Sequence, residues 1–249
     1  MSEIIPLPVT ALLVPVLAYF FKILTPAAAM APFSNTIIFL FMGGFTLAAL
    51  LNRYNIDLWL ADRVIRFAGG SLWLSIVGFY GVTSILSMFI SNTATTAMMV
   101  PIAVSLIDKK FPRMRTMLLL GTAYAANIGG NGTVVGSPPN AIAAAALDLT
   151  FFEWFRVGFP TMLAMFPLVI ASLWFVIKPE RGAYVNKIDI ATFQWSLRSK
   201  GAVALFLFTI ICWIFSSQIS NLISLKKFDH MIAILITALA PATGLILSL

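Results

Sequence analysis

Long runs of apolar residues, separated by short polar gaps, make up most of this chain. A transmembrane helix needs about 20 mostly apolar residues. Five runs are suited to cross a membrane once: residues 6–24, 36–51, 157–177, 201–216 and 231–249. Two longer apolar stretches, 71–108 and 114–149, are each interrupted by polar or glycine-rich residues. The pattern predicts an all-α integral membrane protein with several spans.

Two segments between the spans have a different pattern. Residues 57–70 place apolar and charged side chains on opposite faces of a helix, which is typical of a helix that lies in the membrane interface. Residues 178–200 are polar and are expected to form a connector outside the membrane.

Composition supports this reading. Hydrophobic residues make up 60% of the chain and charged residues 10%, whereas about a quarter of the residues in a soluble domain are charged. The net charge of +7 comes from basic residues in the gaps between apolar runs. They form no continuous face for nucleic acid, and the positive-inside rule explains them better.

With one cysteine, Cys212, and one histidine, His230, the chain offers no disulfide and no Cys/His metal site.

The basic clusters also predict the path of residues 71–108. Arg53, Arg63 and Arg66 precede this stretch, and a second cluster lies within residues 109–115. Both clusters lie in the cytoplasm only if the stretch enters the membrane and returns. We therefore expect a re-entrant hairpin with its tip at residues 91–93.

The tip carries polar groups suited to bind ions. Ser87 and Ser91 are four residues apart and share a helix face. The side-chain amide of Asn92 has one acceptor and two donors. Asn92 or Thr93 is expected to cap the following half-helix, whose amino terminus favours an anion.

The second interruption, residues 129–140, is rich in glycine and proline. Glycine lets the backbone turn sharply and approach a ligand. Pro138 and Pro139 keep Ser137 out of the helical region, so we expect carbonyl groups near Gly136 to be free of a helix ladder. Asn140 is expected to start a short helix over residues 141–147.

Backbone that leaves helical geometry at membrane depth is tolerated only inside the protein or along a cavity, and transporters use such breaks as binding sites. No Asp, Glu, Lys or Arg lies within residues 71–107 or 118–147. A coupling ion would therefore meet only neutral oxygen atoms, which suits sodium better than a proton. The competing interpretation is that these Ser, Thr and Gly residues serve only helix packing. Residues 34–36 repeat the Ser-Asn-Thr triplet, but a helix N-cap explains them fully.

Residues 91–101 (SNTATTAMMVP) and 128–140 (IGGNGTVVGSPPN) resemble the hairpin and the second binding loop of the divalent anion/sodium symporter family. The similarity is strongest to bacterial sodium/dicarboxylate symporters. It implies an elevator-type transporter, built from two inverted repeats, that works as a homodimer in the cell inner membrane. The resemblance places sodium at Ser87, Ser91, Asn92 and the Gly136 carbonyl, and the dicarboxylate at Asn92, Thr93 and Ser137.

On this basis the chain divides into three parts. Residues 1–70 would form scaffold spans and the interfacial helix. Residues 71–149 would belong to the transport domain, with the hairpin at 71–108 and a broken helix at 114–149. Residues 150–249 would hold further spans and the cytoplasmic connector.

The family's second Ser-Asn-Thr hairpin has no counterpart after Ser137, so the chain is expected to be one half of a transporter that lacks its second repeat. Two alternatives remain. One is an exchanger or inorganic-oxyanion carrier of the same superfamily, and the other is a non-transporting membrane subunit. An enzyme is not expected, because the sequence contains no catalytic carboxylate pair, metal cluster or activated nucleophile.

Overall fold

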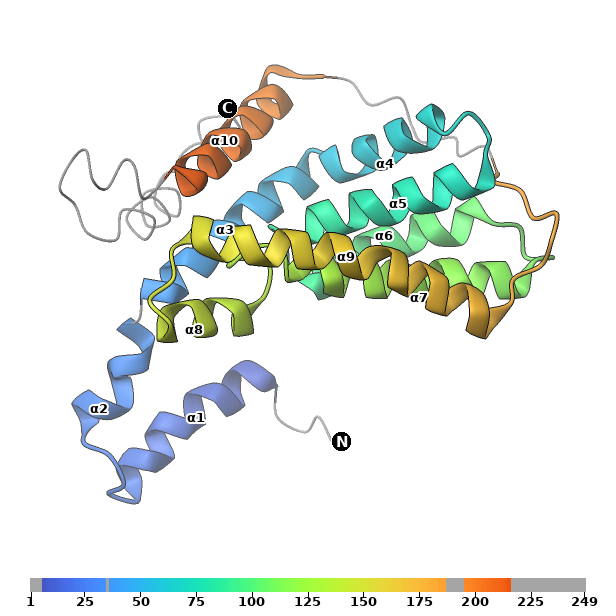
Figure 1. Cartoon of the computed structure of the whole chain (residues 1–249). Helices are drawn as coiled ribbons and strands as arrows, with labels where there is room; N and C mark the ends of the chain where they lie inside the picture. The colour runs from blue at the N-terminus through green and yellow to red at the C-terminus, as the bar shows by residue number, and fades with distance from the viewer. Residues whose placement is uncertain (1–5, 35, 187–194, 216–249) are drawn as a thin grey trace.

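The computed structural model describes residues 6–34, 36–186 and 195–215, and the regular elements in these ranges are helices (Figure 1). Their bounds are α1 Leu7–Phe20, α2 Pro26–Met30, η1 Ala31–Ser34, α3 Thr36–Arg53, α4 Ile56–Phe67, α5 Leu72–Ser87, α6 Asn92–Leu106, α7 Pro112–Gly130, α8 Pro138–Ala146, α9 Phe151–Ile177 and α10 Leu197–Ile214. The all-helical prediction is confirmed. The expected span 231–249, His230 and residue 35 of the triplet lie outside the described residues.

Helix α7 packs against three other helices of the bundle, α5, α6 and α9. Small residues allow this close packing. A Cβ at Gly121 would lie 2.0 Å from the Tyr80 hydroxyl, which donates a hydrogen bond to the Met117 carbonyl at 2.8 Å. Ser84 donates in the same way to the Ala125 carbonyl at 2.9 Å. These bonds fix α5 against α7 over several turns.

Helices α5 and α6 run in opposite directions and are joined by a short turn, residues 88–91 (Figure 1). The predicted helical pair is therefore present, while its return within the membrane stays a prediction. Helix α6 continues through Pro101 to Leu106.

The connector after α9 packs against the base of this helical pair. Backbone N–H of Asn186 donates to the Leu106 carbonyl at 2.8 Å. The Glu180 carboxylate accepts from the backbone N–H groups of Arg113 and Met114, at 2.9 and 2.8 Å, at the start of α7. Partial burial opposes ionisation of Glu180, but these two donors outweigh it and lower the pKa of the carboxyl group.

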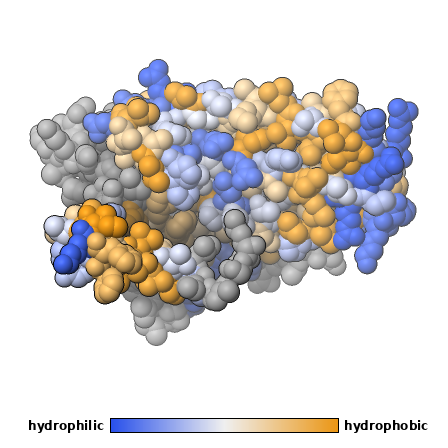
Figure 2. Space-filling model, turned by 90° about the horizontal axis from the view of Figure 1, so that it is seen from below, coloured by the Kyte–Doolittle hydropathy of each residue, from blue (hydrophilic) through white to orange (hydrophobic). Residues whose placement is uncertain are grey.

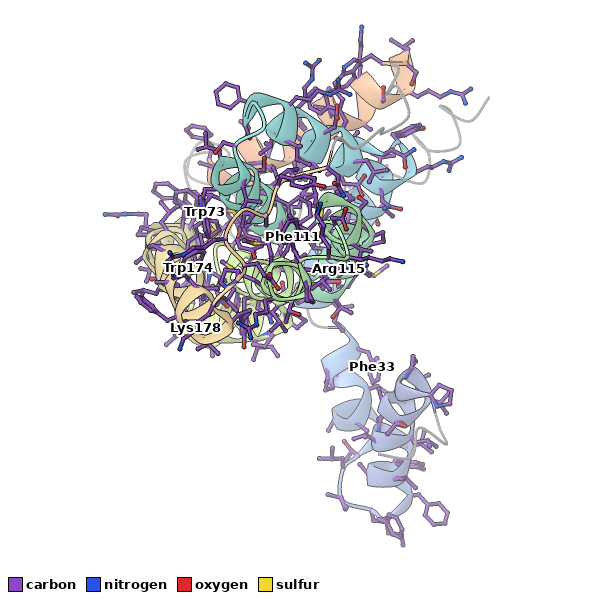
Figure 3. The ribbon with its side chains drawn as sticks, turned by 90° about the vertical axis from the view of Figure 1, so that its right-hand side faces the viewer. Phe33, Trp73, Phe111, Arg115, Trp174 and Lys178 are labelled. Carbon is purple, nitrogen blue, oxygen red and sulfur yellow. The ribbon has the colours of Figure 1, made fainter. Side chains whose placement is uncertain are left out.

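Basic residues gather at this end of the bundle. Arg115, near the start of α7, and Lys178, after α9, lie at the end that faces the viewer in Figure 3. Figure 2 shows hydrophilic side chains collected at the same end and hydrophobic ones over much of the surface between the ends. This arrangement fits the predicted cytoplasmic end.

Among the described residues, α9 and α10 are long and apolar enough to cross a membrane. Helix α9 begins earlier than residue 157, because Thr150 and Glu153 form a capping box at its start.

The amino-terminal expectations need correction. The predicted span 6–24 contains a helix of only 14 residues, α1, which lies apart from the bundle beside α2 (Figure 1). It ends because the chain turns at Lys22, whose φ is +58°.

The amphipathic helix is confirmed as α4, with Arg66 bonded to Asp62 at 2.7 Å. Its Asp57, however, is buried rather than solvated.

Candidate functional site

The two interruptions predicted from the sequence meet in space. The Thr133 hydroxyl, from the loop between α7 and α8, donates to the Met88 carbonyl in the turn between α5 and α6. The same oxygen accepts from the backbone N–H of Gly136 at 3.1 Å. One buried side chain thus joins the hairpin tip, defined here as residues 87–93, to the glycine-rich loop, residues 129–137.

Asn92 lies at the junction of these two segments. Its Oδ1 atom lies 2.8 Å from the Ser87 hydroxyl oxygen and 3.3 Å from each of the carbonyl oxygens of Gly136 and Ala126. Its Nδ2 atom lies 3.3 Å from Oδ1 of Asn127. This arrangement gathers four oxygen atoms from the tip, the loop and α7.

The Asn92 amide fits its surroundings in two orientations. When Oδ1 faces the carbonyl groups of Gly136 and Ala126, it meets two acceptors, an arrangement that a cation between these oxygen atoms would stabilise. In the opposite orientation Nδ2 faces the same groups and donates to both carbonyls and to Ser87. The hydrogen-bond network decides between the orientations, so the presence or absence of a cation would select one.

A glycine is required beside this amide. A Cβ at Gly130 would lie 2.2 Å from Oδ1 and 2.8 Å from Nδ2 of Asn92, closer than any normal contact. A Cβ at Gly136 would lie 2.4 Å from the Gly130 carbonyl oxygen. Both glycines therefore permit the close approach of backbone and side chain.

Asn140 shapes the loop, but not in the predicted way. Its amide donates to the carbonyl groups of Gly130 and Thr133, at 2.8 and 2.9 Å. The short helix α8 starts earlier than predicted, at Pro138, with Ser137 as the N-cap residue. Proline is favoured in the first turn because its missing N–H would have no helical partner there.

The N-cap of α6 is also corrected. Ser91, and not Asn92 or Thr93, accepts a hydrogen bond from the backbone N–H of Ala94, at 3.2 Å. Thr93 is exposed and Ser137 is half-buried. Since Asn92 lies beside Gly136, the amino-terminal ends of α6 and α8 lie near each other, which favours negative charge between them.

The structure thus unites Ser87, Asn92 and Gly136, as predicted. No described hydrogen bond joins Ser91, Thr93 or Ser137 to this cluster. Sequence reasoning missed Ala126 and Asn127. Only Asn127 gave a signal, as an amide within the apolar stretch of α7. No group of three or more His, Cys, Asp or Glu side chains suited to a metal occurs among the described residues.

Known proteins that this chain resembles are transporters. Residues 1–249 match the citrate transporter family, CitMHS. An uncharacterized transporter of Haemophilus influenzae is 36% identical over 98% of this chain and 55% of its own length. An uncharacterized transporter of Methanocaldococcus jannaschii is 38% identical over 93% of this chain and 53% of the length of that transporter. The sodium-dependent dicarboxylate transporter SdcS of Staphylococcus aureus is 34% identical over 70% of this chain, which is 37% of the length of SdcS.

The chain spans about half the length of the first two of these relatives. Its match to the family covers every residue, including the hairpin tip and the glycine-rich loop. These relatives are transporters rather than enzymes, which makes the chain a membrane protein. The chain therefore belongs to the citrate transporter family.

Proposed function

We propose that this chain forms part of a sodium-coupled symporter that carries small di- and tricarboxylate anions, such as succinate, across the cell inner membrane. The observation that carries the proposal is the cluster of neutral oxygen atoms around Oδ1 of Asn92. The name of the SdcS relative, a sodium-dependent dicarboxylate transporter, supports the same ion and substrate class.

In this proposal sodium binds among the oxygen atoms of Ser87, Asn92 and Gly136, and Ser91 completes the set predicted from the sequence. We add the Ala126 carbonyl to this set, because its oxygen atom lies 3.3 Å from the Asn92 amide. Hydroxyl, amide and carbonyl oxygen atoms are ligands that hard cations accept. A site without a carboxylate fits a monovalent cation.

The anion would bind on the exposed side of this cluster. Asn92, Thr93 and Ser137 supply neutral donors, and the amino-terminal ends of α6 and α8 add the positive ends of two helix dipoles. The bound cation would contribute a full positive charge beside these neutral donors. Affinity for the anion should therefore depend on sodium.

The length of the relatives and the resemblance to divalent anion/sodium symporters support a second, inverted repeat with its own hairpin. We propose that both repeats complete the site, move by an elevator mechanism, and assemble as a homodimer. The 249-residue chain alone is then expected not to transport.

The test uses the complete protein encoded by the gene, reconstituted in liposomes with labelled succinate. Uptake that requires an inward sodium gradient, and that stops when potassium replaces sodium, is expected. Sodium-independent uptake that needs an internal anion would instead indicate an exchanger. Transport of inorganic oxyanions alone would indicate an oxyanion carrier, and the absence of any transport would favour a non-transporting subunit.

The re-entrant path needs its own test. Cysteines introduced at Gly70 and Lys110, which flank the helical pair, should react with an impermeant thiol reagent from the same side of the membrane. Labelling from opposite sides would contradict the hairpin and the position of its tip.

A further inference from the structure

We propose that Asn127 contacts the transported anion, and that the cation sets the orientation of its amide through Asn92. This inference rests on the proposed function and adds a residue that links the two ligands.

The position of Asn127 points to a ligand. It lies in the central helix α7, whose neighbours Ala126 and Ile128 are buried, yet its own side chain is exposed. An exposed amide within an apolar stretch is costly in lipid, so such a group lines a polar cavity or binds a partner. The described contact of Asn127 is with Asn92, at the site.

With a cation present, the two amides have one favourable arrangement. The cation holds Oδ1 of Asn92 toward the carbonyl groups of Gly136 and Ala126. Nδ2 of Asn92 then donates to Oδ1 of Asn127, 3.3 Å away. Because the oxygen of Asn127 is engaged, its Nδ2 group is left to donate to a carboxylate.

Without a cation, the favourable arrangement reverses. Nδ2 of Asn92 donates to the carbonyl groups of Gly136 and Ala126, at 3.3 Å each, and Oδ1 faces Asn127. Asn127 must then turn its Nδ2 group inward to donate to Asn92. Its oxygen points outward and repels a carboxylate.

The pair therefore couples the two ligands without any change of protonation. A primary amide is suited to this role because its donor and acceptor occupy opposite ends of one planar group. Rotation by half a turn exchanges them and leaves the shape unchanged. A ligand shifts such an equilibrium by its differential affinity for the two states.

The experiment measures the KM for succinate at limiting and at saturating sodium, in proteoliposomes that contain the complete protein. For Asn127→Ala, the KM at saturating sodium should rise about tenfold, as expected for the loss of one hydrogen bond to a charged group. The ratio of the two KM values should fall below that of the wild type, because the part of the coupling that passes from Asn92 through Asn127 is lost, while the charge of the cation and the contact of Asn92 remain.

Two further variants sharpen the result. Asn127→Asp still accepts from Asn92 but places a negative charge beside the anion, so the KM should rise about a hundredfold. Thr116→Ala, near the start of the same helix, serves as the control. The Thr116 side chain is exposed and its hydroxyl donates to the Pro112 carbonyl of its own helix, at 2.9 Å, so the wild-type KM and sodium response should remain.

A merely structural role of Asn127 would lower Vmax or yield and leave the KM ratio unchanged, which would overturn the inference. A wild-type KM and ratio in Asn127→Ala would overturn it as well. Failure of the wild-type protein to show sodium-driven uptake would instead refute the proposed function. The two failures are therefore distinguishable.

Discussion

The hairpin tip and the glycine-rich loop both interrupt helices, but they supply the site with different groups. The tip contributes side chains: the Ser87 hydroxyl and the Asn92 amide. The loop contributes chiefly backbone, the Gly136 carbonyl, while the buried Thr133 hydroxyl joins the loop to the tip and Ser137 is the one loop side chain proposed to bind the anion. A substitution in the tip should therefore remove a ligand group, whereas a substitution in the loop should move one.

The two segments are also stabilised differently. The tip is a short turn followed by a serine-capped helix, which is a local structure. The loop depends on Asn140 and Thr133, which satisfy three of its backbone polar groups. Because lipid offers no water to these groups, the loop needs such partners. The tip is thus formed mainly by local contacts, whereas the loop also depends on the buried side chains of Thr133 and Asn140.

The largest effect is expected from Asn92→Asp in the tip. The change keeps the shape but replaces the donor with a negative charge beside an anionic ligand. Two like charges about 4 Å apart, at an effective dielectric constant near 20, repel by roughly 4 kcal/mol. Succinate affinity should fall about a thousandfold. Asn55→Asp is the control, because the exposed Asn55 side chain makes no capping hydrogen bond at the start of α4. Unchanged succinate affinity in Asn92→Asp would refute a contact between Asn92 and the anion.

A smaller loss is expected from Gly130→Ala, which displaces the same amide from the side of the loop. The added Cβ would lie 2.2 Å from Oδ1 of Asn92, so both sodium and succinate affinity should fall about tenfold to a hundredfold. Gly81→Ala is the matched control, because a Cβ there meets nothing within 4 Å. Normal uptake by Gly130→Ala would show that the position of Asn92 is not restricted.

Ser87→Ala removes one oxygen atom from the proposed cation site and leaves the anion donors in place. The half-saturating sodium concentration should rise about tenfold, whereas the KM for succinate at saturating sodium should stay near that of the wild type. Ser75→Ala, in the same helix, removes a buried hydroxyl that has no hydrogen-bond partner among the described residues and should change neither value. An equal rise of both constants would place Ser87 outside the cation site.

The smallest effect is expected from Thr133→Val, which breaks the link between tip and loop without removing a proposed ligand. Loss of the hydrogen bonds to Met88 and Gly136 should weaken sodium binding severalfold and lower the melting temperature. Thr133→Ser keeps the hydroxyl and should restore both. A Thr133→Ser variant as defective as Thr133→Val would show that the methyl group, and not the hydroxyl, holds the segments together.

The sequence by itself determined the helices, the two breaks and the neutral chemistry of the site. The length of each apolar run predicted α3, α10 and the end of α9 within a few residues, because a helix in lipid must satisfy its own backbone. The glycine and proline residues of 129–140 predicted the loop for an equally local reason. Capping was less predictable: the N-cap of α6 is Ser91 rather than Asn92 or Thr93, and the N-cap of α8 is Ser137, three residues before the expected Asn140.

Only the tertiary structure decided which groups meet. Asn92 reaches Asn127 across 35 positions of sequence, and Thr133 reaches Met88 across 45. The Ala126 carbonyl belongs to an ordinary helical residue and has no sequence signature at all. Such contacts depend on how α5 and α6 pack against α7, and that packing is set by the combined shape of many small side chains rather than by any local pattern.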